Sequence, residues 1–191
     1  QNYFENKGEL AGLGNVIRVV VENTEDDIFD PEYLDILSKV NDELLVTIGV
    51  DRAWMKSIWM PSVRWTTVNE EGFDGGGVMP DTYDGSEESL QQLRVNIANA
   101  GLVGKLVANN FKSSMIFVPM LEIEPSGEQL DYGKFSDKLE EIRSRYEAEG
   151  EGKIKIHIVG FAKILGDLLD GMAQMMFFFA AAALIAGLLL F

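Results

Sequence analysis

The sequence contains no cysteine and a single histidine, His157. The first absence excludes disulfides, thiolate metal ligands and a cysteine nucleophile. The second leaves no partner histidine for a metal set, and no Ser–His or Cys–His arrangement converges on one reaction. His157 falls on the polar side of an alternating segment, where a solvated side chain is the expected state. We therefore predict no enzyme activity, no metal site and no cofactor.

Positive charge is also scarce, with 16 Lys and Arg against 31 Asp and Glu and a formal net charge of −15. Such an acidic body repels phosphate backbones, which excludes nucleic acid as a partner. In the acidic segment DTYDGSEES, Asp81 and Asp84 are three positions apart, whereas the ligands of a calcium loop alternate. The glycine-rich segment FDGGGVMP lacks the Lys-Ser/Thr ending of a phosphate-binding loop. Both segments are predicted to be connections without a ligand.

Charge is missing altogether from the last 21 residues, Gly171 to Phe191, and Gln174 is the main polar interruption of their apolar character. As a helix with a rise of about 1.5 Å per residue, this run would be roughly 31 Å long, which matches the thickness of a bilayer core. We therefore predict a juxtamembrane and transmembrane helix over residues 162–191. Because the run stops without an exit flank and the chain begins with Gln1, we expect a fragment of a longer protein.

Residues 1–161 are predicted to form one α+β domain in which short strands alternate with amphipathic helices. β-Branched and apolar runs predict strands over residues 15–23, 50–59, 113–121 and 153–161, with a further short strand near 63–68. Apolar residues at helical spacing behind caps such as Asp30 and Ser86 predict helices over residues 30–44, 86–101 and 135–146. This order favours a ferredoxin-like two-layer sandwich, with the helices on one side of the sheet.

Five stretches of the chain, in the same order, resemble one known family. They are GNVIRVVVEN, DIFDPEYLDILSKVNDEL, GVDRAWMKSIWMPSVRWTTVNEEGF, GLVGKLVANNFKSSMIFVPML and IKIHIVGFAKILGDLLDG. The chain resembles the first extracytoplasmic porter domain of the RND superfamily of exporters, in the branch of the mycobacterial large membrane proteins and the hopanoid transporters. The GFA turn at Gly160–Ala162 is similar to the entry into the second membrane helix of that family. Where a proline is expected before Gly49 the chain has Ile48, which affects that turn alone.

The resemblance implies a function and a location. It implies a proton-motive-force-driven exporter of hydrophobic or amphiphilic compounds or lipids in the bacterial inner membrane, with residues 1–161 on the periplasmic side. The implied partners are the lipid bilayer, the remaining transmembrane helices, a second porter domain and the transported compound, and a homo-oligomer stays open. The proton-carrying carboxylates would lie on a later helix, outside this chain. A single-span extracytoplasmic sensor or binding module is the alternative.

All three tryptophans and two methionines fall within the segment WMKSIWMPSVRW. Large, adaptable apolar side chains of this kind suit a cleft for amphiphilic molecules. We take Trp59, Met60 and Trp65 as candidate substrate-path residues, because they flank Pro61, where an exposed loop is expected. Trp54 is expected in the core. For each residue of this cluster, packing in the core and contact with a neighbouring porter domain stay open as alternatives.

Overall fold

A three-stranded antiparallel sheet organises the domain. The computed structural model describes residues 15–70, 72–121, 123 and 126–190. Strand β1 (Val16–Asn23) lies in the centre of the sheet, between β4 (Ser113–Pro119) and β5 (Ile154–Gly160), and pairs antiparallel with both. In this register Val19 lies opposite Ile116 and Ile158, so side chains of like character share a face. The predicted strands over residues 15–23, 113–121 and 153–161 are confirmed.

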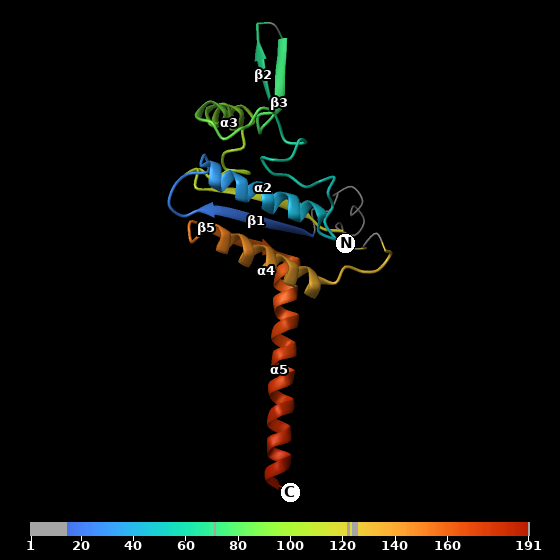
Figure 1. Cartoon of the computed structure of the whole chain (residues 1–191). Helices are drawn as coiled ribbons and strands as arrows, with labels where there is room; N and C mark the ends of the chain where they lie inside the picture. The colour runs from blue at the N-terminus through green and yellow to red at the C-terminus, as the bar shows by residue number, and fades with distance from the viewer. Residues whose placement is uncertain (1–14, 71, 122, 124–125, 191) are drawn as a thin grey trace.

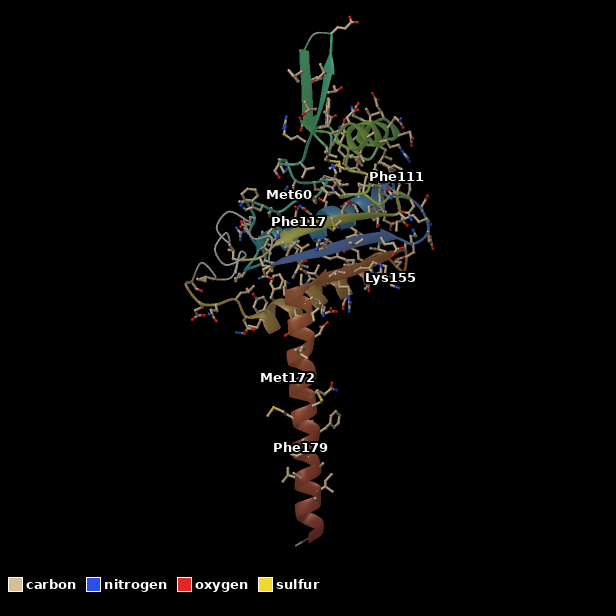
Figure 2. All side chains as sticks on the ribbon, turned by 180° about the vertical axis from the view of Figure 1, so that it is seen from behind. Met60, Phe111, Phe117, Lys155, Met172 and Phe179 are labelled. Carbon is tan, nitrogen blue, oxygen red and sulfur yellow. The ribbon has the colours of Figure 1, made fainter. Side chains whose placement is uncertain are left out.

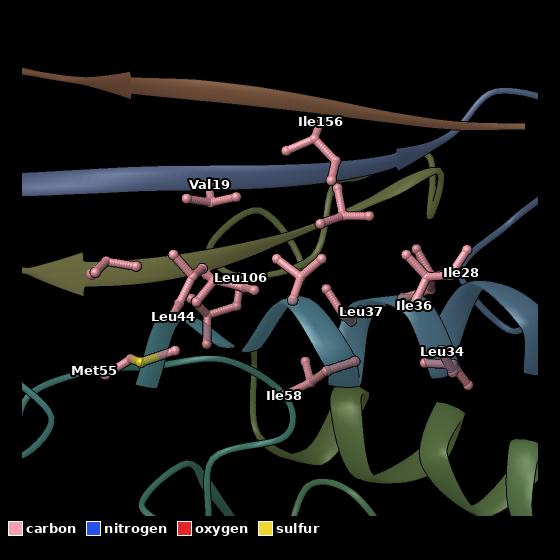
Figure 3. Close-up of a cluster of buried hydrophobic side chains, with 14 of the residues drawn as sticks. Val19, Ile28, Leu34, Ile36, Leu37, Leu44, Met55, Ile58, Leu106 and Ile156 are labelled. Carbon is pink, nitrogen blue, oxygen red and sulfur yellow. The ribbon is translucent and has the colours of Figure 1, made fainter. Parts of the chain in front are cut away.

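Two helices cover the same face of this sheet, α2 (Pro31–Val46) over β1 and β4 and α4 (Tyr132–Glu149) over β5 (Figure 1). Asp30 caps α2 by accepting a hydrogen bond from the Glu32 amide at 3.1 Å, and Pro31 occupies the first helical position. Asp131 caps α4 in the same way, so that this helix begins three residues earlier than the sequence predicted. Figure 3 shows the apolar side chains of α2 between the sheet and the chain segment that carries Met55 and Ile58.

The opposite face of the sheet is largely open and is turned toward the viewer in Figure 2. The alternation predicted for β5 is confirmed, because Ile154 and Ile156 are buried whereas Lys155 and His157 are exposed. On the same open face, the Nε2 atom of His157 lies 2.7 Å from a carboxylate oxygen of Glu22. The domain therefore has one covered and one accessible face.

The segment between α2 and β4 departs from the prediction. No regular strand forms over residues 50–59, and only Val50 and Lys56 form isolated bridges, with Met120 and Phe117 of the β4 edge. Beyond them, β2 (Arg64–Asn69) and β3 (Gly72–Gly77) pair as a separate antiparallel hairpin, which projects from the domain beside α3 (Glu87–Asn99) in Figure 1. The strand predicted near residues 63–68 is confirmed, whereas the glycine-rich β3 was not foreseen. The observed fold class is mixed α+β.

Helix α5 (Phe161–Leu190) follows β5 directly and extends away from the domain (Figure 1). Its first turns pack on α4, where the Lys163 ammonium lies 2.8 Å from a carboxylate oxygen of Glu140 and also pairs with Asp167. The predicted helix over residues 162–191 is confirmed as a helix through Leu190. Among the described residues, no helix is long and apolar enough to cross a membrane.

Candidate functional site

An apolar groove of about 590 Å³ runs along the outer edge of β4. Its floor is formed by Met115 and Phe117, which belong to the open face of the sheet, where Figure 2 labels Phe117. Residues 53–63, which precede β2, form one wall, and residues 102–106, which follow α3, form the other. The full lining consists of Ala53, Trp54, Met55, Lys56, Ser62, Val63, Leu102, Lys105, Leu106, Met115 and Phe117.

Backbone hydrogen bonds fix both walls of the groove to β4. Lys56 and Phe117 exchange two of them, at 3.0 and 2.8 Å, and the Met115 amide donates to the Leu106 carbonyl at 2.7 Å. A buried hydrogen bond of 2.6 Å from the Ser57 hydroxyl to the Asn41 side-chain oxygen ties the first wall to α2 as well. Because these contacts belong to the folded domain itself, the groove is largely preformed, as small-molecule sites usually are.

The groove combines an apolar interior with positive charge. Its volume lies within the range of about 300–1,000 Å³ typical of small-molecule sites, and most of its side chains are aliphatic, aromatic or thioether. The two charged side chains of the lining are those of Lys56 and Lys105, both of which are exposed. In the described part of the chain neither lysine has an acidic partner. Such a surface can bind a molecule with one apolar and one polar end.

Trp59, Met60 and Trp65, the residues selected from the sequence, lie outside the lining of this groove. Trp59 and Met60 pack partly buried against the core, and the Trp59 ring meets Tyr83 edge-on with centroids 5.6 Å apart. Trp65 belongs to the projecting hairpin, where its indole lies against Gly76 of the paired strand. The structure therefore places the three residues around different neighbours and does not assemble them into one cavity.

Trp54 corrects the expectation that it belongs to the core. Its side chain is 50% exposed and forms part of the groove wall. The physical reason is that the chain turns at this point, with the Trp54 amide donating to the Asp51 carbonyl at 3.2 Å, so the next apolar side chain, Met55, points inward instead. The Trp- and Met-rich segment of the sequence supplies part of the groove lining, including Trp54 and Met55. It could not indicate which of these side chains faces outward.

A second candidate region is the ion-pair cluster around Glu43 at the interface of α2 and α4. Its carboxylate accepts hydrogen bonds from Arg145 at 2.9 and 3.0 Å and from the Tyr146 hydroxyl at 3.0 Å, and it lies 2.9 Å from the Lys138 ammonium. Burial alone would raise the pKa of Glu43, but the hydrogen bonds from Lys138 and Tyr146 hold it below its ordinary value. A carboxylate that stays ionised among its partners holds the two helices together. It is poorly suited to proton transfer.

Among the residues that the structure describes, no group of three or more His, Asp or Glu side chains lies close enough together to bind a metal ion. In the segment around Asp81 and Asp84, the Asp84 carboxylate accepts a hydrogen bond from the Ser86 amide at 3.0 Å, which stabilises the approach to α3. His157 pairs with Glu22 and has no second imidazole available in the sequence. The groove at β4 is thus the site whose chemistry is best suited to a ligand.

Comparison with protein families gives no match for this sequence, and comparison with curated proteins gives no significant match.

Proposed function

We propose that the chain supplies a periplasmic substrate-path domain, over residues 1–161, to a proton-motive-force-driven exporter of hydrophobic or amphiphilic compounds or lipids in the bacterial inner membrane. In this proposal residues 162–191 begin a membrane helix. The remaining transmembrane helices, a second porter domain and the proton-carrying carboxylates belong to the rest of the transporter. The RND-type resemblance described above motivates the assignment.

The observation that carries the proposal is the apolar surface of α5. This helix leaves β5 without a linker, and the described side chains from Met175 to Ile185 include the highly exposed Phe177 and Phe179. At about 1.5 Å per residue the whole helix is roughly 45 Å long, so most of it cannot reach the domain core. An exposed apolar surface of this size needs an apolar environment. The proposal relies on the whole uncharged run Gly171–Phe191, part of whose side chains lie outside the described residues.

The topology is consistent with a ferredoxin-like porter domain. The strand order β4-β1-β5 with α2 and α4 on one face matches three strands and both helices of such a sandwich. The bridges from Val50 and Lys56 run along the outer edge of β4, where the fourth strand of that fold would lie. In this interpretation the hairpin β2–β3 and α3 are an insertion between the second and third strands of the sandwich.

The groove at β4 gives the proposed domain a place for an amphiphile, and Trp59, Met60 and Trp65 remain candidates for contacts elsewhere along the path. We expect substrate to pass between this domain and its neighbours, so that residues beside the core can also contribute. Substituting Trp59 and Trp65 one at a time in the intact transporter and measuring export tests whether either residue contributes to transport.

Single-cysteine labelling tests the proposed location. The chain has no native cysteine, so Glu87→Cys and Ser144→Cys each introduce one exposed thiol, on α3 and α4. In spheroplasts of cells that express the chain from its own gene, both thiols should react with a membrane-impermeant maleimide before lysis. The chain should also stay in the membrane pellet after carbonate extraction. Labelling only after lysis would refute the topology, and release by carbonate would refute the membrane helix.

The alternative function, a single-span sensor or binding module, shares the proposed membrane helix and the extracytoplasmic domain. The two functions differ in the polypeptide that continues from the chain. An exporter requires several further spans and a second similar soluble domain, whereas a sensor requires neither. The reading frame beyond Phe191 therefore discriminates between them, and a frame that enters a signalling domain would overturn the exporter.

A further inference from the structure

The arrangement of cations on this acidic protein is uneven. The helix-covered side of the domain uses its cations in ion pairs: Lys39 with Asp35 and Glu149, Lys138 and Arg145 with Glu43, and Lys163 with Glu140. A different set has no acidic partner in the described part of the chain. These are Arg18 and Lys155 on the open face, Arg52, Lys56, Arg64 and Lys105 in or beside the groove segments, and Lys112.

Two of these cations without an acidic partner lie in the apolar groove, and two others are next to its lining residues in the sequence. Lys56 and Lys105 are both part of its lining, and each belongs to a segment that hydrogen-bonds to the outer edge of β4. Arg52 directly precedes the lining residues Ala53 and Trp54 in the chain, and Arg64 directly follows Ser62 and Val63. On a body with a formal charge of −15, most cations are expected to find a carboxylate, so a group left unpaired around one apolar groove is available to a ligand of negative charge.

We propose that this groove binds a single-chain anionic amphiphile, such as a long-chain carboxylate. The alkyl chain lies on Trp54, Met115 and Phe117, and the head group contacts the ammonium groups of Lys56 and Lys105. This inference deepens the proposed function and rests on it, because it selects anionic compounds among the amphiphiles that the exporter would carry.

Charge and size together favour this occupant over a polypeptide. The groove of about 590 Å³ lies in the range of small-molecule sites. The apolar floor is bounded by two cations, which matches a ligand with one chain and one anionic end. Mobile lysine side chains at an exposed rim can adjust to a carboxylate without disturbing the buried residues Met55 and Leu106 below them.

The test measures quenching of tryptophan emission in the whole chain held in nanodiscs of zwitterionic phosphatidylcholine. The probe is a brominated long-chain fatty acid, and the matched ligand is the monoacylglycerol with the same brominated chain, which lacks the charge. A bromine atom quenches only a nearby indole, so the signal assigned to the groove is the part that disappears in the variant Trp54→Phe. We expect the fatty acid to quench this signal with at least about fivefold higher affinity than the neutral ligand.

The lysines are tested by charge removal that keeps the aliphatic stem. Lys56→Met and Lys105→Met should each weaken fatty-acid binding about fivefold and leave binding of the neutral ligand unchanged, and Lys→Arg at either position should restore affinity. Lys155→Met is the matched control, because it removes another exposed cation without an acidic partner, and this one lies outside the groove. Raising the salt concentration should weaken binding of the fatty acid alone.

The possible results separate the inference from the proposed function. Equal binding of the charged and neutral ligands, or an equal effect of Lys155→Met, would overturn the anionic specificity while the groove remained an amphiphile site. No quenching at Trp54 by either ligand would remove the groove from the substrate path and overturn the inference. If neither ligand quenches Trp54 and the Trp54 emission of the intact transporter is already blue-shifted, polypeptide fills the groove. This result would also overturn the inference.

Discussion

The buried hydroxyl of Tyr33 offers a sharp test of what holds the helices on the sheet. It donates a hydrogen bond to the Val21 carbonyl at 2.8 Å and accepts one from the Ser114 amide at 2.9 Å, so a single side chain of α2 connects β1 and β4. Tyr33→Phe keeps the ring but removes the hydroxyl that bonds to the Val21 carbonyl and the Ser114 amide, at a position where Tyr33 is fully buried. At about 1–2 kcal/mol for each of the two buried backbone groups, the free energy of unfolding should fall by about 2–4 kcal/mol.

Tyr83→Phe is the matched control, because the Tyr83 hydroxyl is buried with no hydrogen-bond partner in the described part of the chain. Removing an unsatisfied hydroxyl should leave stability unchanged or raise it by about 1 kcal/mol. Urea unfolding of the whole chain, followed by far-UV circular dichroism, measures both variants. For a domain of this size the loss in Tyr33→Phe corresponds to a fall in Tm of roughly 6–12 °C. Equal shifts in the two variants would refute the reasoning, since the two hydroxyls differ in their hydrogen bonds.

The pH dependence supplies an independent readout for Tyr33. Burial raises the pKa of its phenol far above the ordinary value of 10.0, despite the hydrogen bond from Ser114 that acts in the opposite direction. Above about pH 10 the unfolded chain loses this proton while the folded chain keeps it, so stability must fall as pH rises. Tyr33→Phe should therefore unfold less steeply between about pH 10 and 12 than the parent chain. An unchanged alkaline slope would show that Tyr33 does not contribute to it.

Three further predictions concern single positions. Glu43→Gln should lower the free energy of unfolding by about 1 kcal/mol at pH 7. Because the lowered pKa of Glu43 stabilises the fold only while the carboxylate is ionised, the variant should also lose less stability than the parent chain as pH falls below about 4.5. Unfolding measured at a series of acidic pH values gives both effects. Gly160→Ala should lower the free energy of unfolding by about 1–3 kcal/mol, because the added Cβ would lie 2.6 Å from the Val16 carbonyl oxygen. Gly171→Ala is its control: the added Cβ meets nothing within 4 Å, so the Tm in thermal unfolding should not change. Trp59→Phe should leave the free energy of unfolding nearly unchanged, because the indole nitrogen is buried without a hydrogen-bond partner among the described residues. Trp59→Ala should lower it by about 3 kcal/mol, because the ring packs against the core. A larger loss in Trp59→Phe than in Trp59→Ala would contradict this packing.

The regular elements follow from local rules that the sequence contains in full. β-Branched residues predicted β1, and the polar–apolar alternation of β5 predicted both the strand and the face it covers. Asp30 followed by Pro31 predicted the start of α2, because a capping carboxylate and a fixed backbone angle act within one turn of chain. These signals work because the interactions behind them join residues only a few positions apart.

The segment over residues 50–59 shows where such rules fail. Its apolar residues predicted a strand, yet the chain turns back twice, with hydrogen bonds from Trp54 to Asp51 and from Met60 to Ser57. Met55 and Ile58 are drawn into the core beside α2, whereas the backbones of Asp51 and Lys56 bond to the edge of β4. Burial against distant elements therefore outweighed the local preference for an extended backbone.

The sequence by itself determined the mixed α+β class, the helical run at the C-terminus and the segment in which tryptophan and methionine gather. Only the tertiary structure decided that Trp54 faces a groove while Trp59 packs against Tyr83. It also decided that Lys56 and Lys105 line the same groove, although 49 positions separate them in the chain. Side chains in an irregular segment follow no period, so their direction depends on which partners the folded chain brings beside them.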